Sequence, residues 1–316
     1  MKIGYVGGHW HTNIGNSFYN LGAINLLKKI DQHSVYFIPD PAQEYWEHLK
    51  NDYKYIDKLD LDLLIVTGPS FGGKFINAYK SVFESFTNKN KQIAFLSVGA
   101  VDYSKKETDN VAKFLDKFNI KFVATRDKLT YEFYKNRINA PVFDGICTSM
   151  YLDESISVPN LDDKYYVYNF DKRTEPIIFK DNFYNFKFRK KNIYEKPQMD
   201  INGLNIVRTS SVPFSSFSKV IYNRPKIYWS SSPEGYLSIY KSAQVVFSDR
   251  VHTCCAALVM GSRAMYISVS QRSKQKRYEL LTRLGLEKIF NEPCQLDRSF
   301  IKHEKENLFQ FLKENL

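Results

Sequence analysis

"AQVVFSDRVHTCCAALVMGS", residues 243–262, joins two apolar runs through a short charged segment. The first run, AQVVF, predicts a buried strand, and Thr253 begins a predicted helix through CCAALVM. Asp249, Arg250 and His252 are therefore expected on a strand-to-helix turn. The unsatisfied N–H groups and the dipole at the start of a helix make such a turn receptive to anions.

The side chains of this turn allow two interpretations. Arg250 has a planar guanidinium that matches a carboxylate or a phosphate, and His252 can exchange a proton near neutral pH. In the alternative interpretation Asp249 caps the helix, Arg250 pairs with a carboxylate, and His252 is a core residue whose hydrogen bonds are satisfied. Sequence physics alone leaves both interpretations open.

Short apolar runs alternate with helix-like segments along the rest of the chain as well. Apolar strands separated by helices are typical of parallel sheets that are covered on both faces. In such sheets ligands bind at the carboxyl ends of the strands. The predicted strands include 2–8, 34–39, 61–68, 92–100, 164–170, 203–211 and 263–270, and the predicted helices include 17–30, 75–87, 274–286 and 299–316.

A composition shift in SISVPNLDD, residues 155–163, predicts a domain boundary. We therefore expect an α/β domain at 1–158 and a second α/β domain at 159–316, which includes the terminal amphipathic helix. The expected fold class is α/β, with two Rossmann-like domains that face each other across a cleft.

Composition limits the classes of partner. Lys and Arg number 45 against 34 Asp and Glu, a net charge of +11. This excess indicates an anionic partner, such as a phosphorylated metabolite, nucleic acid or an anionic membrane, unless it reflects only the lysine-rich coding of an AT-rich genome. No nucleic-acid-binding motif accompanies the charge, so we expect no nucleic acid. The N-terminus does not resemble a signal peptide and no apolar run reaches about 20 residues, so we expect a soluble cytosolic protein.

Three further motifs are weaker signals. Gly68, Gly72 and Gly73 in TGPSFGGK either let backbone approach a phosphate or form a tight turn. Arg126 ends a predicted strand in ATRDK, residues 124–128. His9 and His11 lie two residues apart with no evident third ligand, and the four cysteines form no CxxC pair, so we expect no metal.

Residues 179–197, FKDNFYNFKFRKKNIYEKP, are dense in aromatic and basic side chains and have little periodicity. Such a segment can stack on sugars or bases, or contact a membrane surface. A solvated, locally folded loop is the simpler expectation.

Taken together, these motifs resemble the polysaccharide pyruvyl transferases, a family that is GT-B-like in fold. The resemblance covers most of residues 1–290, and the Arg-x-His turn after a strand is its most specific part. It rests on NIGNSFYNLGAINLL, GPSFGG, SVGA, TRDKLTYEFYKN, SDRVHTCCAALVMGSRAMYIS and KRYELLTRLGL.

The resemblance implies transfer of a pyruvyl group from phosphoenolpyruvate, as donor substrate, to two hydroxyls of a sugar, forming a cyclic ketal. No further cofactor is expected. The acceptor would be a sugar or a lipid-linked glycan, the latter at the inner face of the membrane. The N-terminal domain would take the acceptor and the C-terminal domain the donor.

The resemblance also assigns residues. His252, Arg250 and Arg126 are the predicted catalytic residues, with His252 as general acid or base. A family lysine maps onto Lys276, although Lys274 is close enough to confuse the assignment. The predicted substrate-binding residues are Lys276, Gly68, Gly72, Gly73, Asn16 and Thr253.

Two other functions fit the same residues. A GT-B glycosyltransferase that uses a nucleotide-sugar could bind the diphosphate at the cationic turn. A non-catalytic protein that binds sugar phosphates would need the cations without the proton transfer.

Overall fold

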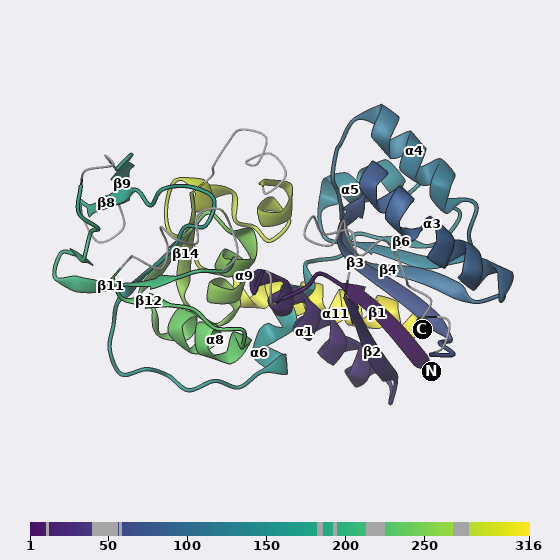
Figure 1. The fold of residues 1–316 in the computed structure, drawn as a ribbon, viewed down its shortest axis with the longest axis horizontal. Coiled ribbons are helices and arrows are strands. Elements are labelled where there is room, and N and C mark those ends of the chain that lie inside the picture. The colour runs from purple at the N-terminus through teal and green to yellow at the C-terminus, as the bar shows by residue number, and fades with distance from the viewer. Residues whose placement is uncertain are drawn as a thin grey trace. The chain divides into compact units, whose positions relative to one another are not determined.

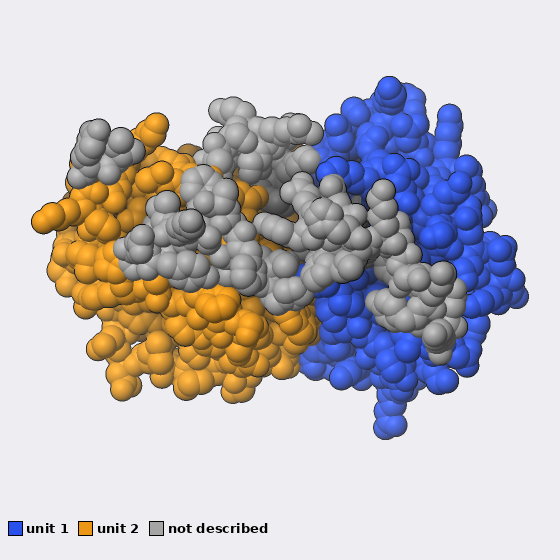
Figure 2. All heavy atoms as spheres, in the orientation of Figure 1, with its two compact units in different colours: residues 1–9, 22–148, 302–316 blue, residues 10–21, 149–301 orange. Residues whose placement is uncertain are grey.

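The computed structural model describes residues 1–10, 13–39, 56, 59–181, 186–191, 195–212, 225–267 and 278–316. The chain forms two compact units, coloured separately in Figure 2. Unit 1 comprises Met1–His9, Gly22–Thr148 and Lys302–Leu316, and unit 2 comprises Trp10–Leu21 and Ser149–Ile301. Each unit has its own mainly parallel sheet, which confirms the predicted α/β class.

Unit 1 contains a six-stranded, fully parallel sheet (Figure 1). Its central strands are apolar because both faces are covered; β4, for example, is buried at every residue after its first. In spatial order the strands are β2 (Ser34–Pro39), β1 (Lys2–Gly7), β3 (Leu63–Phe71), β4 (Gln92–Ala100), β5 (Ile120–Thr125) and β6 (Val142–Phe143).

Helices between the strands supply the rest of this core. Phe83 of α3 is fully buried and contacts the rings of Phe95 on β4 and Phe114 on α4. Apolar residues at helical spacing therefore pack an aromatic layer against the sheet. The helices are α1 (Gly15–Ile30), α3 (Gly73–Asn88), α4 (Lys105–Leu115), α5 (Lys128–Tyr134) and α11 (Arg298–Asn315).

Unit 2 contains a second sheet, in which β10 pairs antiparallel and the other neighbours pair parallel. Its order is β10 (Asp200–Ile201), β11 (Leu204–Thr209), β7 (Tyr166–Asn169), β13 (Val245–Ser248) and β14 (Arg263–Tyr266), with β12 (Ile227–Tyr228) beside β11. The helical elements are η2 (Thr148–Tyr151), α6 (Leu152–Ser155), α8 (Pro233–Ser242), α9 (Val251–Val259) and η3 (Glu287–Phe290). The rings of Tyr166 and Phe247 are fully buried in its core.

Part of the aromatic and basic segment at 179–197 forms regular structure, where the sequence favoured a loop. Strands β8 (Ile177–Lys180) and β9 (Phe186–Arg189) make a separate two-stranded antiparallel sheet. The ring of Phe186 is buried against Phe247, which anchors the second strand to the core of unit 2.

The two units divide the chain differently from the predicted split at residue 158. The loop and first turns of α1, residues 10–21, belong to unit 2, because Ile14 N donates to Ser211 O over 2.8 Å and Phe18 contacts Tyr240. Residues 149–158 belong to unit 2 as well.

The terminal helix also departs from the expected division. Most of α11, from Lys302 onward, belongs to unit 1. Its Phe311 stacks on Phe143 at 4.5 Å between ring centroids and meets Phe122 edge-on. The amphipathic pattern correctly predicts a helix, but the apolar face does not say which sheet it covers.

Candidate functional site

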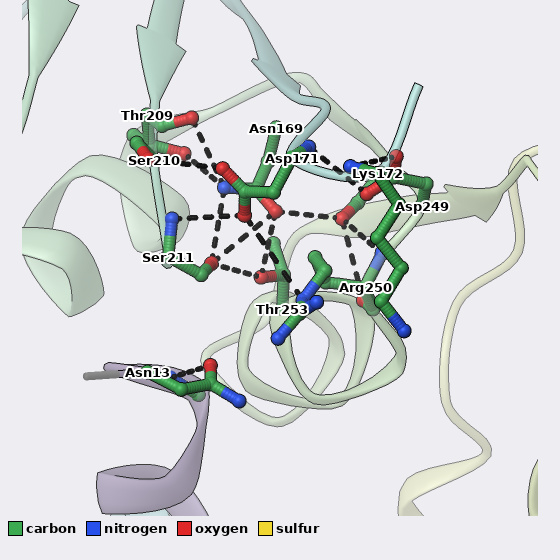
Figure 3. Close-up of polar contacts among 12 residues, drawn as sticks. Asn13, Asn169, Asp171, Lys172, Thr209, Ser210, Ser211, Asp249, Arg250 and Thr253 are labelled. Atoms are coloured by element: carbon green, nitrogen blue, oxygen red, sulfur yellow. Dashed lines mark hydrogen bonds and ion pairs between the residues drawn. The ribbon is translucent and has the colours of Figure 1, made fainter. Parts of the chain in front are cut away.

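The polar centre of unit 2 lies where the strand order reverses. From β7 the chain passes to β11 on one side and later returns to β13 on the other. Both neighbours are parallel to β7, so the carboxyl ends of the three strands lie at one edge. Ligands bind at such switch points in open α/β sheets. Figure 3 shows polar residues at the ends of these strands: Asn169, Asp171, Lys172, Thr209, Ser210, Ser211, Asp249, Arg250 and Thr253.

Asn169 joins the ends of all three strands. Its Nδ2 donates to Thr209 O over 3.1 Å, to Thr209 Oγ1 over 3.0 Å and to Ser211 Oγ over 3.1 Å. Its Oδ1 accepts from Ser248 Oγ at 2.9 Å and from Thr253 Oγ1 at 3.1 Å. Asn169 is fully buried, so these bonds satisfy polar atoms that would otherwise be costly in the core.

Asp171 is the second buried connection. Its carboxylate accepts from Ser210 Oγ at 2.9 Å and from Ser211 N at 3.0 Å. The same carboxylate lies 4.0 Å from Arg250 Nε. Asp171 therefore ties the end of β11 to the arginine of the strand-to-helix turn.

Asp249 does not cap α9, contrary to one sequence interpretation. Its side chain accepts from the backbone N–H groups of Asp171, over 3.2 Å, and Lys172, over 2.9 Å. Burial and the neighbouring Asp171 carboxylate raise the pKa of Asp249 to about 6. The N-cap residue of the helix is Arg250, in extended backbone and without a side-chain cap.

Helix α9 begins at Val251, two residues before the predicted start at Thr253, so Arg250 is its N-cap residue and His252 lies in its first turn. Arg250 N donates to Ser248 Oγ over 2.9 Å, and the Arg250 side chain is 15% exposed. The ring of His252, in the first turn, lies 4.9 Å from the ring of Tyr19 on α1. The guanidinium is thus partly accessible to solvent, while Asp171 and the hydrogen bond of the turn hold the Arg250 side chain in place.

The loop before α1 joins this centre. A Cβ atom added to Gly15 would lie 3.5 Å from His252 Cβ, an ordinary van der Waals distance, so the start of α1 lies beside the first turn of α9. Asn13 Nδ2 in this loop donates to Asn16 Oδ1 in the first turn of α1 over 3.3 Å. The structure therefore brings the predicted residue Asn16 into the unit that holds His252, although the sequence placed it in the other domain.

Two further predicted residues have different outcomes. Thr253 is fully buried, and its hydroxyl contacts Asn169 and Ser211, which is a structural role. Substrate binding by Thr253 stays a prediction. Lys276 and Lys274 lie outside the described residues, so the assignment of the family lysine also stays a prediction.

Arg126 lies at the carboxyl end of β5 in unit 1, where the sequence expected it. The residue is only 5% exposed. Within the described part of the chain no carboxylate lies within ion-pair distance of its guanidinium. The neighbouring Asp127 caps α5, because it accepts from Thr130 N at 2.8 Å and from Tyr103 Oη at 3.3 Å. The adjacent Asp127 carboxylate attracts the guanidinium without forming an ion pair, so the buried cation can still bind an anionic ligand.

The backbone around Arg126 is shaped to accept the side chain. A Cβ atom added to Gly99 would lie 2.8 Å from Arg126 Nε, which no real Cβ contact tolerates. Ser97, two residues earlier, has a φ of +56°, and its hydroxyl accepts from Thr148 N at 3.1 Å. Register shifts flank this point in the pairs β3–β4 and β4–β5. Such irregularities re-aim side chains at sheet edges.

The glycines of the GPSFGG loop have separate roles. Gly68 has a φ of +87° at the bulge in β3, a conformation that favours glycine. Gly72 precedes α3, and the N–H of Gly73 donates to the Glu107 carboxylate. An internal carboxylate thus occupies this helix start, and substrate binding by the three glycines stays a prediction.

Sequence reasoning missed Asn169, Asp171 and the serines after β11. The available signal was positional, because NFD and TSS each follow a buried apolar strand directly. Applying the strand-end rule to these segments as well as to SDR would have found them.

The next two predictions concern a metal at the histidine pair and a membrane-spanning segment. His11 lies outside the described residues, so the expectation of no metal at the histidine pair stays a prediction. Among the described helices, none combines the length and the apolarity needed to cross a bilayer.

Comparison with known proteins supports the fold. A UDP-GlcNAc 2-epimerase from Methanocaldococcus jannaschii, solved with UDP-GlcNAc and UDP, is 11% identical over 99% of this chain and 100% of that one, with a TM-score of 0.50. The Neisseria meningitidis UDP-GlcNAc 2-epimerase bound to UDP-GlcNAc is 9% identical over 100% of both chains, with the same TM-score. These likenesses show a GT-B-type fold.

The family follows from the sequence match. No curated protein sequence is significantly similar to the chain. The family model described as polysaccharide pyruvyl transferase matches residues 13–271, which include the loop before α1, Arg126 and the Arg-x-His turn. The chain therefore belongs to the polysaccharide pyruvyl transferase family and is a transferase of GT-B-like fold.

Proposed function

We propose that the protein transfers a pyruvyl group from phosphoenolpyruvate to two hydroxyls of one sugar in a polysaccharide or glycan precursor. The methylene carbon of the donor gains a proton and becomes a methyl group. The two sugar oxygens bond to the adjacent carbon, and the bond from that carbon to the phosphate oxygen breaks. One hydroxyl proton balances the new methyl group, and the other leaves with inorganic phosphate.

The Arg-x-His turn carries this proposal. Arg250 follows β13 at the switch point of unit 2, is 15% exposed, and has its guanidinium beside the buried Asp171. A small doubly anionic donor needs such a fixed planar cation, since each charge-assisted hydrogen bond contributes about 1.5–3 kcal/mol. The N–H groups at the start of α9 add donors for the same anion.

His252 is the proposed general acid and base. It lies within two residues of Arg250 and in the first turn of α9. Ketal formation requires protonation of a carbon and deprotonation of a hydroxyl, and an imidazole can serve either step near neutral pH. Contact with the Tyr19 ring limits where the imidazole can turn.

Arg126 is proposed to bind an anionic group of a substrate. The family resemblance assigns it a catalytic role, and its burial without an internal ion pair among the described residues supports that role. Desolvation strengthens the attraction between a guanidinium and an anion that replaces water beside it.

The proposed acceptor is a sugar of a glycan precursor, soluble or lipid-linked. We place the reaction in the cytoplasm, at the inner face of the membrane where the precursor carries a lipid. No cofactor beyond the donor substrate enters the proposed chemistry.

A donor assay tests the proposal. The purified protein is incubated with a pyranoside acceptor and either phosphoenolpyruvate or nucleotide-sugars. We expect phosphate release only with phosphoenolpyruvate, and a product whose mass increases by a pyruvyl ketal. The variant His252→Gln should lose turnover while it still binds phosphoenolpyruvate. Full turnover by this variant would remove His252 from the proposed role.

A nucleotide-sugar glycosyltransferase is the second candidate. The observation that favours it is the likeness to epimerases that were solved with UDP-GlcNAc and UDP. In this case the cationic turn would bind a diphosphate. Release of a nucleoside diphosphate in the same assay, without consumption of phosphoenolpyruvate, would decide for it.

A further inference from the structure

A two-stranded ribbon of unit 2, β8 and β9 with the residues up to 191, exposes aromatic and basic side chains together. Figure 1 shows it at the margin of the unit, where it forms a sheet of its own. Phe179 is 46% exposed and Phe188 is 45% exposed. Phe179 lies opposite Lys187, whereas Phe188 lies opposite Ile178, so the two rings face opposite sides of the ribbon.

The base of the ribbon is firmly held. Gln198 Oε1 accepts from Tyr168 Oη at 2.9 Å and from Ile178 N at 3.0 Å, and Gln198 Nε2 donates to Ile178 O over 2.9 Å. Ile178 and Phe186 are themselves buried in the core. The exposed rings are therefore presented by a fixed scaffold and are not part of an unpacked segment.

The charge around the ribbon is strongly positive. Basic side chains outnumber acidic ones two to one between residues 179 and 200. Lys187 pairs with Asp181 at 2.5 Å, and Arg189 pairs with Glu195 through two contacts of 2.5 and 2.9 Å. Among the described residues no acidic side chain lies within ion-pair distance of three further cations, Lys190, Lys191 and Lys196.

We infer that the ribbon docks on an anionic lipid bilayer. Basic side chains near a membrane surface are attracted to acidic headgroups, and aromatic rings enter the interface between headgroups and acyl chains. A ribbon with one exposed ring on each face can bury both rings by entering a fluid interface edge-on. The inference extends the proposed lipid-linked acceptor, but membrane docking can be measured without any acceptor.

Two other occupants fit the ribbon less well. A single nucleic acid strand stacks its bases along aromatic rings that share one face, and here the rings face apart. An acidic glycan would be held by the cations but would leave at least one exposed phenylalanine in water. The bilayer uses both the charge and the apolar surface.

Co-sedimentation with acceptor-free vesicles tests the inference. The full chain is mixed with vesicles of phosphatidylcholine alone or with added phosphatidylserine, at low and at physiological salt. We expect binding only to the anionic vesicles and weaker binding at the higher salt. Lys190→Gln/Lys191→Gln should weaken binding by about tenfold to thirtyfold, since each lysine near an anionic surface contributes several-fold in affinity.

Matched variants separate docking from folding and from net charge. Lys106→Gln/Lys113→Gln removes the same charge from exposed positions on α4 and should bind vesicles like the unchanged protein. Phe179→Ser/Phe188→Ser should also lose binding while keeping the unfolding midpoint within a few degrees. Phosphate release with a soluble acceptor should be the same in all three variants.

Defined results would overturn the inference. These are equal binding to neutral and anionic vesicles, unchanged binding by both ribbon variants, or equal losses in the α4 control. Tighter binding to single-stranded RNA than to anionic vesicles, or displacement from vesicles by a soluble acidic oligosaccharide, would also overturn it. Loss of the proposed donor activity with vesicle binding intact would contradict the proposed function and leave the docking inference standing.

Discussion

In unit 2, Arg250 lies 4.0 Å from a buried carboxylate, and three strand ends are joined around it by Asn169 and Asp171. In unit 1, Arg126 is more deeply buried, yet no described carboxylate pairs with it, and its place is set by Gly99 and a distorted strand. The first arrangement fixes a cation by hydrogen bonds. The second leaves a guanidinium with no ion pair among the described residues, although the adjacent Asp127 carboxylate attracts it, so the two arginines should respond differently to replacement.

Replacing each arginine should give the largest effect on activity, and it tests whether the two residues differ as described. Arg250→Gln should reduce phosphoenolpyruvate-dependent kcat/KM by about a thousandfold or more, because a fixed cation in a desolvated site is lost. Arg126→Met should reduce it similarly but raise the free energy of unfolding by about 1–3 kcal/mol, because a buried charge that lacks an ion pair is removed. Phosphate release and urea unfolding measure the two quantities.

The stability difference is the decisive part of this test. Arg250→Gln leaves Asp171 buried without its cation, so that variant should be neutral or less stable. Equal losses of stability in both variants would show that Arg126 has an internal partner and that the contrast between the two sheet edges is wrong.

Gly99→Ala tests whether activity depends on the position of the Arg126 guanidinium in unit 1. The added Cβ would lie 2.8 Å from Arg126 Nε and 3.0 Å from Asp127 Oδ2, so the guanidinium must move. We expect kcat/KM to fall by about a hundredfold, as small misplacements of a positioned group can cost that much. Circular dichroism should show an intact fold.

A double variant shows whether Gly99 acts through the arginine. Gly99→Ala/Arg126→Met should be no less active than Arg126→Met alone, because the second change removes what the first displaces. Additive losses of kcat/KM would instead mean that Gly99 affects activity independently of Arg126.

Asp171→Asn tests the corresponding support in unit 2. The amide keeps the shape of the side chain but loses the negative charge beside Arg250. We expect about a tenfold lower kcat/KM, mainly through a higher KM for phosphoenolpyruvate, since the cation is held less firmly. Ser210→Ala, which removes one hydrogen bond to the same carboxylate, should have a smaller effect. Unchanged kinetics in Asp171→Asn would limit Asp171 to a structural role.

Much of this arrangement follows from local sequence. SDRVHT lies between an apolar strand and an apolar helix, and the structure places Arg250 and His252 at the start of α9 as that pattern predicts. Arg126 likewise directly follows the last residue of β5. Periodicity identifies the elements and their order, and the strand-end rule then places polar residues at the functional edge.

Assignment to units was less predictable. Asn16 belongs with His252 because Ile14 N bonds Ser211 O across 197 positions of sequence, and no local pattern encodes that pairing. The apolar face of α11 predicts that one side of the helix is buried, but it does not predict that Phe311 stacks on Phe143. The positive φ of Ser97 and the close approach of Gly99 to Arg126 are also tertiary features, since the apolar pattern of β4 predicts neither of them.

The pH dependence of stability tests unit 2 without any activity assay, and it arises from Asp249. Burial and Asp171 raise the pKa of Asp249 to about 6, whereas an aspartate in the unfolded chain titrates near 3.9. The native state therefore holds this proton more tightly, and its contribution to the free energy of unfolding falls as pH rises from about 4 to 6. A shift of that size corresponds to roughly 2–3 kcal/mol.

Asp249→Asn cannot ionise, so it should lose this contribution to the pH slope. Urea unfolding of both proteins at several values between about pH 4 and pH 7 measures the difference. Asp116→Asn, at an exposed position after α4, is the control and should keep the slope of the unchanged protein. If Asp249→Asn also keeps that slope, the carboxyl is ionised throughout the range, and the two backbone N–H groups that it accepts from outweigh its burial beside Asp171.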